Sequence, residues 1–322
     1  MPHRLIEVYG NGRFAEIESL VDTYPVIIGP DNFDEHSVAL SDVEFIFSTW
    51  HMPQLTELQM DELAALKAVF YAAGSVQYFA RPYLERGIHV VSARMANAVP
   101  VAEYVVAQII LASKGYFSKE RISRTFDGRC HSGPDYPGIC DVTVSILGAG
   151  TIGAMVIERL KNLGFEILVF DPLISKQRAR DLGVRKVSLA EAFSAGFIVS
   201  NHIADLPETR GILEGHLFEL LGERATFINT GRGATVVESE MLDVLAKRPD
   251  LTALLDVTAP EPPIRSSPVY ELNNVYLTPH IAGSIGNEVR LLADSVITEF
   301  KNYLLGKRFR ASVTIDELEV MA

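Results

Sequence analysis

The clearest chemical signal in the sequence is a glycine-rich loop between two expected elements. Gly148, Gly150 and Gly153 follow a short β-branched run and open a segment with helical periodicity, the setting that a GxGxxG fingerprint requires. The first glycine permits a tight turn, the second lets the backbone approach a pyrophosphate, and the third lets helix and strand pack closely. With Thr151 and Ile152 between them, these glycines predict a helix amino terminus that faces the phosphates of a dinucleotide.

An acidic residue at a fixed distance from this loop indicates which dinucleotide binds. Asp171 lies 21 residues beyond Gly150, at the end of the next expected strand. A carboxylate there can accept hydrogen bonds from the adenosine ribose and would repel a 2′-phosphate, which favours NAD over NADP. Arg178 and Arg180 follow in the next expected helix and give only weak support for NADP. A structural turn with a solvent-facing aspartate is the alternative, and the complete context makes it the less favoured one.

Four further segments follow the loop in a distinctive order. They are Asn229-Thr230-Gly231-Arg232-Gly233, Leu255-Asp256-Val257 with Glu261-Pro262, Asn274-Val275, and Thr278-Pro279-His280-Ile281-Ala282-Gly283. Two more segments lie upstream of the glycine-rich loop, namely Ala73-Gly74-Ser75 and the stretch from Asn97 to Glu103. Together these segments resemble the D-isomer-specific 2-hydroxyacid dehydrogenase family from about Ser48 to Asn302. They are similar to its NAD-dependent members of the glyoxylate/hydroxypyruvate reductase and phosphoglycerate dehydrogenase type, without a regulatory domain.

The resemblance implies a catalytic set of three side chains. His280 would be the general acid/base, Glu261 would orient its imidazole and favour the protonated form, and Arg232 would bind the substrate carboxylate. Histidine suits this role because it titrates near neutral pH. Each residue could instead be an ordinary surface residue, and the motif around it favours the functional interpretation. The implied reaction moves a hydride between nicotinamide and a 2-hydroxy acid or its 2-keto acid.

The resemblance also implies contacts around the cofactor. Asp256 would accept a hydrogen bond from the nicotinamide carboxamide, although it could simply end a strand. Thr230, Gly231 and Gly283 would line the nicotinamide side. His202 would lie near the adenosine, or be merely a polar strand end. We predict that all five belong to the cofactor site.

Substrate contacts are expected from the first hundred residues. Gly74 and Ser75 would offer backbone N–H groups to the substrate carboxylate. Trp50, the only tryptophan, could shape the side-chain pocket with Tyr78 and Phe79, or could be a core residue. The family usually carries an acidic segment after this glycine, whereas the sequence here continues Ser-Val-Gln-Tyr-Phe-Ala. The identity of the acid therefore stays open, from glyoxylate, lactate, glycerate and hydroxypyruvate to branched or aromatic 2-keto acids.

The elements that must position these residues alternate regularly from about Asp141 onward. Expected strands span residues 142–147, 165–170, 197–200, 225–228, 251–257 and 275–277, and expected helices span 152–163, 211–221 and 238–247. Strands that alternate with helices predict a parallel sheet with right-handed crossovers. Ligands bind at the carboxyl ends of such strands. We therefore predict a doubly wound α/β domain of the Rossmann type that binds NAD.

The first hundred residues show a similar alternation. Expected strands span 43–47, 68–71 and 89–91, an expected helix spans 59–66, and a long C-terminal helix at about 284–305 would return to this part of the chain. The prediction is two doubly wound parallel-sheet lobes with a cleft between them. Residues 1–97 and 287–322 would form a smaller, flavodoxin-like substrate domain, and residues 98–286 the NAD-binding domain.

Composition narrows the classes of partner. The 322 residues include 29 Lys and Arg against 41 Asp and Glu, a net charge of −12, which argues against nucleic acid or an anionic membrane as the main partner. The hydrophobic fraction of 48% excludes a disordered or fibrous chain. The amino terminus lacks a signal-peptide pattern, and residues 99–112 are too short to span a bilayer. A cytoplasmic location is expected.

Two cysteines are present, too few for a disulfide framework. Cys130, His131 and Cys140 could be imagined as metal ligands, but their spacing matches no familiar zinc pattern. Glycine and proline around them indicate a connecting loop. The prediction is two reduced thiols and no metal site.

Two further expectations concern assembly and the class of function. Family members commonly dimerise through the dinucleotide domain, which here would use the segment from Val99 to about Pro137, so we expect a homodimer. Some relatives act as NAD(H)-responsive corepressors, and an NAD(H)-sensing binding protein without significant turnover is the alternative to an enzyme. The complete catalytic set favours the enzyme.

Overall fold

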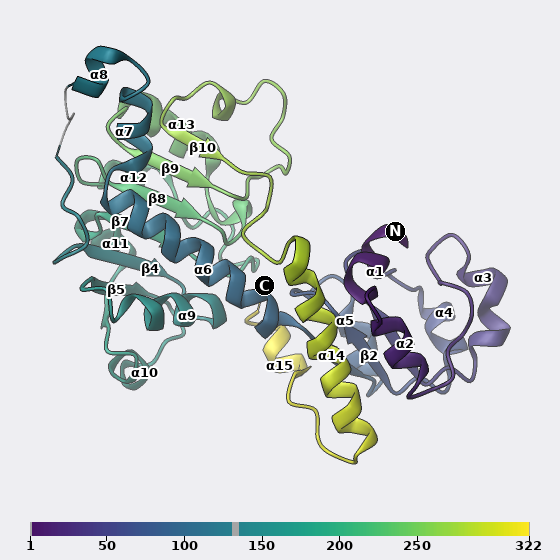
Figure 1. The fold of residues 1–322 in the computed structure, drawn as a ribbon. Helices are drawn as coiled ribbons and strands as arrows, with labels where there is room; N and C mark the ends of the chain where they lie inside the picture. Colours follow the sequence, from purple (N-terminus) through teal and green to yellow (C-terminus); the bar gives the residue numbers. More distant parts are fainter. Residues whose placement is uncertain (1, 131–134, 322) are drawn as a thin grey trace. The chain divides into compact units, whose positions relative to one another are not determined.

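The computed structural model describes residues 2–130 and 135–321 and separates into two compact units. Unit 1 contains Met1–Ala98 and Ser284–Ala322, and unit 2 contains Val99–Gly283 (Figure 1). The first boundary lies one residue from the expected one, and the second comes three residues earlier. Ser284, the first residue of the second segment of unit 1, donates its backbone N–H to Asn97 Oδ1 at 3.1 Å.

Unit 2 is built on a parallel sheet with the strand order β10-β9-β8-β7-β4-β5-β6. The strands are β4 (Thr143–Leu147), β5 (Glu166–Phe170), β6 (Arg185–Lys186), β7 (Ile198–Asn201), β8 (Thr226–Asn229), β9 (Thr252–Leu255) and β10 (Val275–Leu277). Strands 142–147, 165–170, 197–200, 225–228 and 251–257 are thus found within three residues of their expected limits, and 275–277 at its expected limits. The order reverses at β4, which is the switch point where doubly wound sheets bind ligands.

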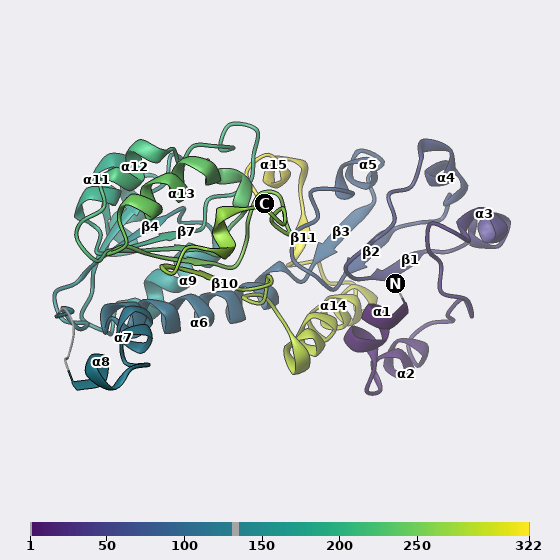
Figure 2. The same ribbon diagram turned by 90° about the horizontal axis from the view of Figure 1, so that it is seen from above.

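Helices cover both faces of this sheet. They are α6 (Arg94–Ser113), α7 (Tyr116–Ile122), α8 (Phe126–Cys130), α9 (Thr151–Leu160), α10 (Lys176–Asp181), α11 (Leu189–Ala195), α12 (Gly215–Glu219) and α13 (Glu238–Lys247). Figure 2 shows α11, α12 and α13 on one side of the sheet and α6 on the other. Phe193 and Leu242 belong to the core on the first side, and Ile109 and Leu160 to the core on the second. The doubly wound fold is confirmed for this unit.

Helix α12 is shorter than the expected helix over 211–221. Gly211 has φ +67°, and its N–H donates to Ala234 O at 2.9 Å. The N–H of Leu213 donates to Thr235 O at 3.0 Å. These bonds hold the segment extended beside Val236, so the helix begins only at Gly215.

Helix α6 extends beyond the expected segment 99–112, and its 20 residues are long and apolar enough to cross a membrane by length and composition. It is the one helix of this kind in residues 2–130 and 135–321. Its residues Val101, Ala102, Val105, Ile109 and Ala112 are buried in the core of unit 2. Core packing therefore accounts for the apolar character of this face.

Unit 1 has a smaller sheet of order β1-β2-β3-β11. Strands β1 (Phe45–Ser48), β2 (Ala68–Tyr71) and β3 (His89–Ser92) are parallel, and a short β11 (Ser312–Val313) adds an antiparallel edge to the expected sheet. Glu299 Oε2 accepts hydrogen bonds from the N–H groups of Arg310 and Ala311, which turns the chain toward β11.

Helices also lie on both faces of the unit 1 sheet. They are α1 (Pro2–Tyr9), α2 (Arg13–Glu18), α3 (Phe33–His36), α4 (Glu57–Glu62), α5 (Ala80–Glu85), α14 (Val289–Leu304) and α15 (Ile315–Leu318). One core joins Val69 to Met60 and Tyr83, and the other joins Phe70 to Phe300. The long C-terminal helix packs on α1 within this unit, so the unit is discontinuous in sequence.

Candidate active site

The carboxyl ends of six strands in unit 2 are level with one another. The register pairs Leu147 with Phe170 and Asn201, Asn201 with Asn229, and Asn229 with Leu255, which pairs with Leu277. The residues that directly follow these strand ends are Gly148, Asp171, His202, Thr230, Asp256 and Thr278. Motifs far apart in the sequence therefore meet along one edge of the sheet.

The glycine loop joins β4 to α9 at this edge. Gly148 has φ +89°, and a Cβ added there would lie 2.7 Å from His202 O. A Cβ at Gly153 would lie 2.0 Å from Gly148 O, whereas a Cβ at Gly150 would meet no atom within 4 Å. Gly148 and Gly153 are thus required by the packing of the turn itself. Gly150 leaves open space before the amino terminus of α9, a cradle that fits a pyrophosphate beside Thr151 and Ile152.

Asp171 lies against the same loop. Its Oδ2 accepts a hydrogen bond from Ala149 N at 2.7 Å. Its Oδ1 accepts from Leu173 N at 2.7 Å and from Ile174 N at 3.0 Å. These bonds hold the carboxylate beside the glycine loop, where a ribose acceptor has to be. The contact with ribose stays a prediction.

The ring of His202 is in hydrogen-bond contact with strand β7, which precedes it. Its Nε2 lies 2.9 Å from Ser200 Oγ, and its Nδ1 is buried without a partner among the described residues. Burial lowers the pKa of His202 to about 4, so the ring is neutral at physiological pH. The backbone of His202 abuts Gly148, and its contact with adenosine stays a prediction.

The residue that follows β8 carries a buried hydroxyl group without a hydrogen-bond partner in the described residues. Thr230 Oγ1 is buried and has no hydrogen-bond partner among residues 2–130 and 135–321. Gly231 N donates to Asn229 Oδ1 at 3.1 Å, and a Cβ at Gly231 would lie 3.2 Å from Asn201 O. A buried hydroxyl without a partner is costly unless a ligand supplies one, which fits the expected cofactor contact at Thr230.

The two members of the expected acid–base pair are in contact. His280 Nδ1 lies 2.6 Å from Glu261 Oε1, and the two side chains are 50% and 42% exposed. Glu261 comes from the loop after β9 and His280 from the turn after β10. Because Nδ1 is turned to Glu261, Nε2 is the nitrogen left to exchange a proton with a substrate.

Arg232 follows β8 and is largely buried. Its Nη1 donates to Gly231 O at 2.8 Å. Burial lowers the pKa of the guanidinium, against the opposing effect of Asp205 and Glu261. Among the described residues no carboxylate forms an ion pair with Arg232. A buried cation of this kind fits a substrate carboxylate, because an anionic ligand would compensate its charge.

Asp256 is 3% exposed at the end of β9. Its carboxylate accepts hydrogen bonds from Thr278, Ile281 and Ala282, all in the turn that carries His280. Gly283 directly follows this turn and closes unit 2. The contact of Asp256 with a nicotinamide carboxamide, and that of Gly283 with the cofactor, stay predictions.

Gly74, Ser75 and Trp50 belong to unit 1, so their part in substrate binding stays a prediction. Gly74 follows the strand end of β2, and Ser92 Oγ donates to its carbonyl at 2.6 Å. Trp50 is half-buried and packs against both cores of the unit, with the Arg4 guanidinium 5.8 Å from its ring. These contacts favour the core interpretation of Trp50.

Aromatic side chains of unit 1 also line a cavity of about 150 Å³. Its lining residues are Gln54, Leu55, Tyr78, Phe79, Pro82 and Tyr83. Tyr78 and Phe79 were expected near a pocket. The sequence carried no signal for the others, because α5 brings Pro82 and Tyr83 to the loop after β1 only in the folded unit.

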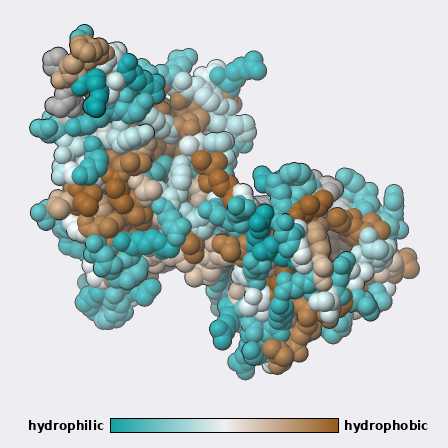
Figure 3. Space-filling model, in the orientation of Figure 1, coloured by the Kyte–Doolittle hydropathy of each residue, from teal (hydrophilic) through white to brown (hydrophobic). Residues whose placement is uncertain are grey.

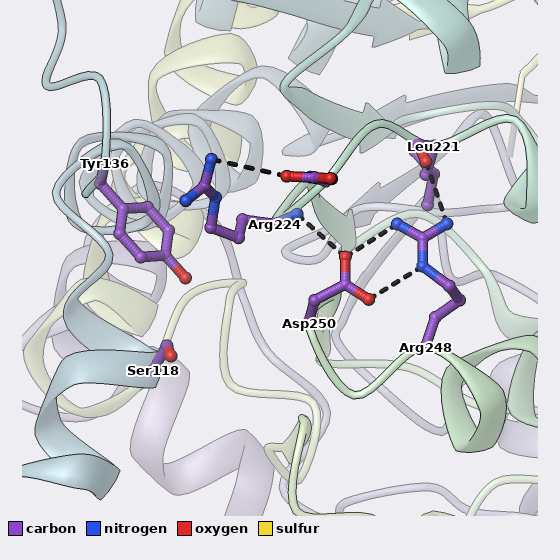
Figure 4. Close-up of a pocket in the computed structure, with 7 residues that line it drawn as sticks. Ser118, Tyr136, Leu221, Arg224, Arg248 and Asp250 are labelled. Carbon is purple, nitrogen blue, oxygen red and sulfur yellow. Dashed lines mark hydrogen bonds and ion pairs between the residues drawn. The ribbon is translucent and has the colours of Figure 1, made fainter. Parts of the chain in front are cut away.

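A larger cavity, of about 600 Å³, lies at the opposite edge of the unit 2 sheet (Figure 4). Arg224 and Asp250 line it just before β8 and β9 begin. Asp250 accepts hydrogen bonds from Arg248 Nε and Nη2, each at 2.8 Å, and from Arg224 N at 3.1 Å. Because its charges are paired and it is far along the strands from His280, this cavity is not a candidate active site.

Within residues 2–130 and 135–321, no group of three or more His, Cys, Asp or Glu is placed to hold a metal ion. Cys130 and Cys140 are free and exposed. His131, the remaining member of the imagined ligand set, lies outside the described residues.

Comparison with known proteins identifies relatives of both the sequence and the fold. Residues 107–282 match the family model described as "D-isomer specific 2-hydroxyacid dehydrogenase, NAD binding domain". D-3-phosphoglycerate dehydrogenase from Archaeoglobus fulgidus is 29% identical over 73% of this chain and 44% of its own length. The chloroplastic D-3-phosphoglycerate dehydrogenase 2 of Arabidopsis thaliana is 32% identical over 62% of this chain and 32% of its own.

The chain thus matches less than half the length of these curated relatives. Among solved structures, the apo form of D-mandelate dehydrogenase from Rhodotorula graminis superposes with a TM-score of 0.81. That match has 20% identity and covers 93% of this chain and 92% of the other. The similarity confirms the fold over nearly the whole chain.

Proposed function

Because this chain belongs to the D-isomer specific 2-hydroxyacid dehydrogenase family, with NAD as the cofactor of its matched domain, we propose that it is an oxidoreductase acting on a small 2-hydroxy acid or 2-keto acid. The observation that carries the proposal is that the His280–Glu261 pair and Arg232, which forms no ion pair among the described residues, follow strands at the sheet edge that holds the glycine loop. Transfer of a hydride at a carbon next to a carboxylate needs this combination of a proton carrier and an anion site.

In the direction of reduction, Arg232 binds the carboxylate and polarises the neighbouring carbonyl group. His280 holds a proton at Nε2 and gives it to the carbonyl oxygen as the carbon becomes tetrahedral. Glu261, 2.6 Å from Nδ1, stabilises the imidazolium before the transfer. Bound NADH supplies the hydride, and the reverse steps describe oxidation of the hydroxy acid.

The test is consumption of NADH with a panel of 2-keto acids, and with NADPH in parallel. We expect turnover with NADH on at least one member, and a preference over NADPH that depends on Asp171. The variants Arg232→Ala and His280→Ala should lose turnover while they still bind NADH. Full turnover in both variants would contradict the mechanism. NADH binding without turnover on any member would favour the NAD(H)-sensing alternative.

We also propose that the protein is a homodimer that assembles through unit 2. Apolar side chains are exposed along the segment from α6 to α8: Leu111 is 38% exposed, Tyr116 50% and Phe126 82%. Figure 3 shows apolar groups on the surface of this region. Exposed apolar side chains along one segment support the proposal that it is an association surface.

The remaining parts of the proposal are a cytoplasmic location and the absence of nucleic-acid and membrane partners. The net charge of −12 supports the latter, since phosphate groups would be repelled. Cell fractionation and a binding assay with duplex DNA and anionic vesicles test these parts. Membrane-bound protein in the fractionation would contradict them.

A further inference from the structure

The turn that carries His280 has an unusual backbone conformation. His280 has φ +55°, in the left-handed region that residues other than glycine rarely adopt. Such a conformation persists only where surrounding contacts hold it, and it is often found where function requires a side chain to be aimed. The contacts that hold this turn therefore bear on how His280 meets Glu261.

A single carboxylate holds the turn. Asp256 Oδ1 accepts hydrogen bonds from Thr278 Oγ1 at 2.7 Å and from Ile281 N at 2.8 Å, and Oδ2 accepts from Ala282 N at 2.9 Å. The backbone carbonyl of Asp256 accepts from His280 N at 3.1 Å. The donors lie on both sides of His280, so the turn is wrapped around this one buried residue.

The network continues into helix α6. Tyr104 Oη lies 3.2 Å from Thr278 Oγ1. A carboxylate can only accept, so Thr278 donates its hydroxyl proton to Asp256 and accepts one from Tyr104. The burial that raises the pKa of Tyr104 keeps this phenol protonated and able to donate. The three side chains form one directed chain from α6 to the turn.

We propose that Asp256, Thr278 and Tyr104 are positioning residues that hold His280 in the left-handed conformation in which its Nδ1 meets Glu261. This rests on the proposed function of His280 as acid/base. It assigns Asp256 a role separate from a cofactor contact, and it assigns roles to Thr278 and Tyr104, which otherwise have none. Loss of the network would let the turn relax and separate the imidazole from Glu261.

The decisive variants change one hydroxyl group. Thr278→Val removes the donor to Asp256 at nearly constant volume, and Thr278→Ser keeps it. We expect Thr278→Val to lower kcat about tenfold or more, as loss of a hydrogen bond to a charged group does, with the KM values for NADH and 2-keto acid unchanged within about twofold. Thr278→Ser should restore kcat to within about threefold of the parent. Tyr104→Phe should give a smaller loss.

Equal kcat in Thr278→Val and Thr278→Ser would overturn the proposal. A rise in the KM for NADH alone, with kcat unchanged, would also overturn it, because it would show that the network serves the cofactor and not His280.

A second measurement does not depend on turnover. The imidazole nitrogen resonances of His280, assigned by their loss in His280→Asn, are recorded by NMR at one fixed pH. We expect the resonance of Nδ1, which lies 2.6 Å from Glu261 Oε1, to shift in Thr278→Val and to return in Thr278→Ser. If the parent enzyme turns over nothing, a shifted resonance still supports the positioning role, although the proposed function then fails. An unshifted resonance overturns the positioning role whether or not the enzyme is active.

Discussion

At the scale of single residues, the buried side chains of Arg232 and His202 differ in the charge that they carry. Arg232 is largely buried and forms no ion pair among the described residues, so an anionic ligand would compensate its charge beyond the effect of Asp205 and Glu261. His202 is the opposite case, because its ring is kept neutral by burial and bonded inward to Ser200. Both residues follow strand ends at the same edge, and the contacts of Arg232 with a substrate and of His202 with adenosine stay predictions.

Replacement of Arg232 tests the carboxylate site. In the complex, Arg232 would form a buried ion pair with the substrate carboxylate. Removal of one partner of such a pair costs about 3–5 kcal/mol, so Arg232→Ala should lower kcat/KM by about a hundredfold or more. Arg232→Lys keeps the charge but loses the planar fork, and should recover only part of the loss. Steady-state kinetics with the best 2-keto acid give kcat/KM for the alanine and lysine variants. NADH binding is measured separately. Equal kcat/KM in alanine and lysine variants would show that the charge of Arg232 is not used.

His202 gives a prediction about stability and pH. Its pKa is about 4 in the folded protein against an ordinary 6.5, so between these values the unfolded chain binds a proton that the folded chain does not. Stability is therefore lost as pH falls from 6.5 to about 4. The free energy of unfolding lost across this window is about 3 kcal/mol.

Urea unfolding of the parent and of His202→Gln at pH values across this window measures the effect. The parent should lose more stability on acidification than the variant. Parallel stability curves for the two proteins would show that His202 does not contribute.

At the scale of elements, the glycines of the loop between β4 and α9 are required for two different reasons, one by the turn itself and one by a ligand. Gly148 is needed by the turn, since its φ of +89° and its contact with His202 exclude a side chain. The described part of the chain does not require glycine at position 150, because a Cβ there would meet no atom within 4 Å and the φ of Gly150 is −65°. The glycine at the second position is therefore explained only by a ligand that approaches the backbone.

Alanine variants of the two glycines provide a matched pair. Gly150→Ala should leave the unfolding midpoint unchanged within about 1 °C and weaken NADH binding about tenfold or more. Gly148→Ala should destabilise unit 2 by about 2 kcal/mol or more. Thermal unfolding and NADH titration distinguish these outcomes. Undiminished NADH affinity in Gly150→Ala would contradict the proposal that the pyrophosphate of the cofactor binds at this loop.

For the whole molecule, the exposed apolar side chains from α6 to α8 predict association. Light scattering should give the mass of a dimer for the parent protein. Phe126→Glu places a charge on a side chain that is 82% exposed and should give a monomer. Val38→Glu, on a side chain that is 89% exposed in unit 1, is the matched control and should remain dimeric. A monomeric parent, or a dimer that survives Phe126→Glu, would contradict assembly through this segment.

The sequence by itself determined the unit 2 strand–helix alternation and the edge of the sheet that carries the site. Buried parallel strands read as apolar runs, and their carboxyl ends lie at one edge in register. For this reason Gly148, Asp171 and Asp256 could be placed near one another without coordinates. The sequence of motifs also identified the family, and residue types alone indicated NAD.

Only the tertiary structure decided what each of these residues touches. Asp256 and Thr278 are 22 residues apart, and their hydrogen bond exists because β9 and β10 are adjacent. Extended pairing of Leu213 beside Val236 shortened an expected helix, and the half-buried Trp50 packs against both cores of unit 1. Local patterns encode periodicity and turns, whereas contacts between distant segments depend on strand order and register. Those contacts place Nδ1 of His280 against Glu261.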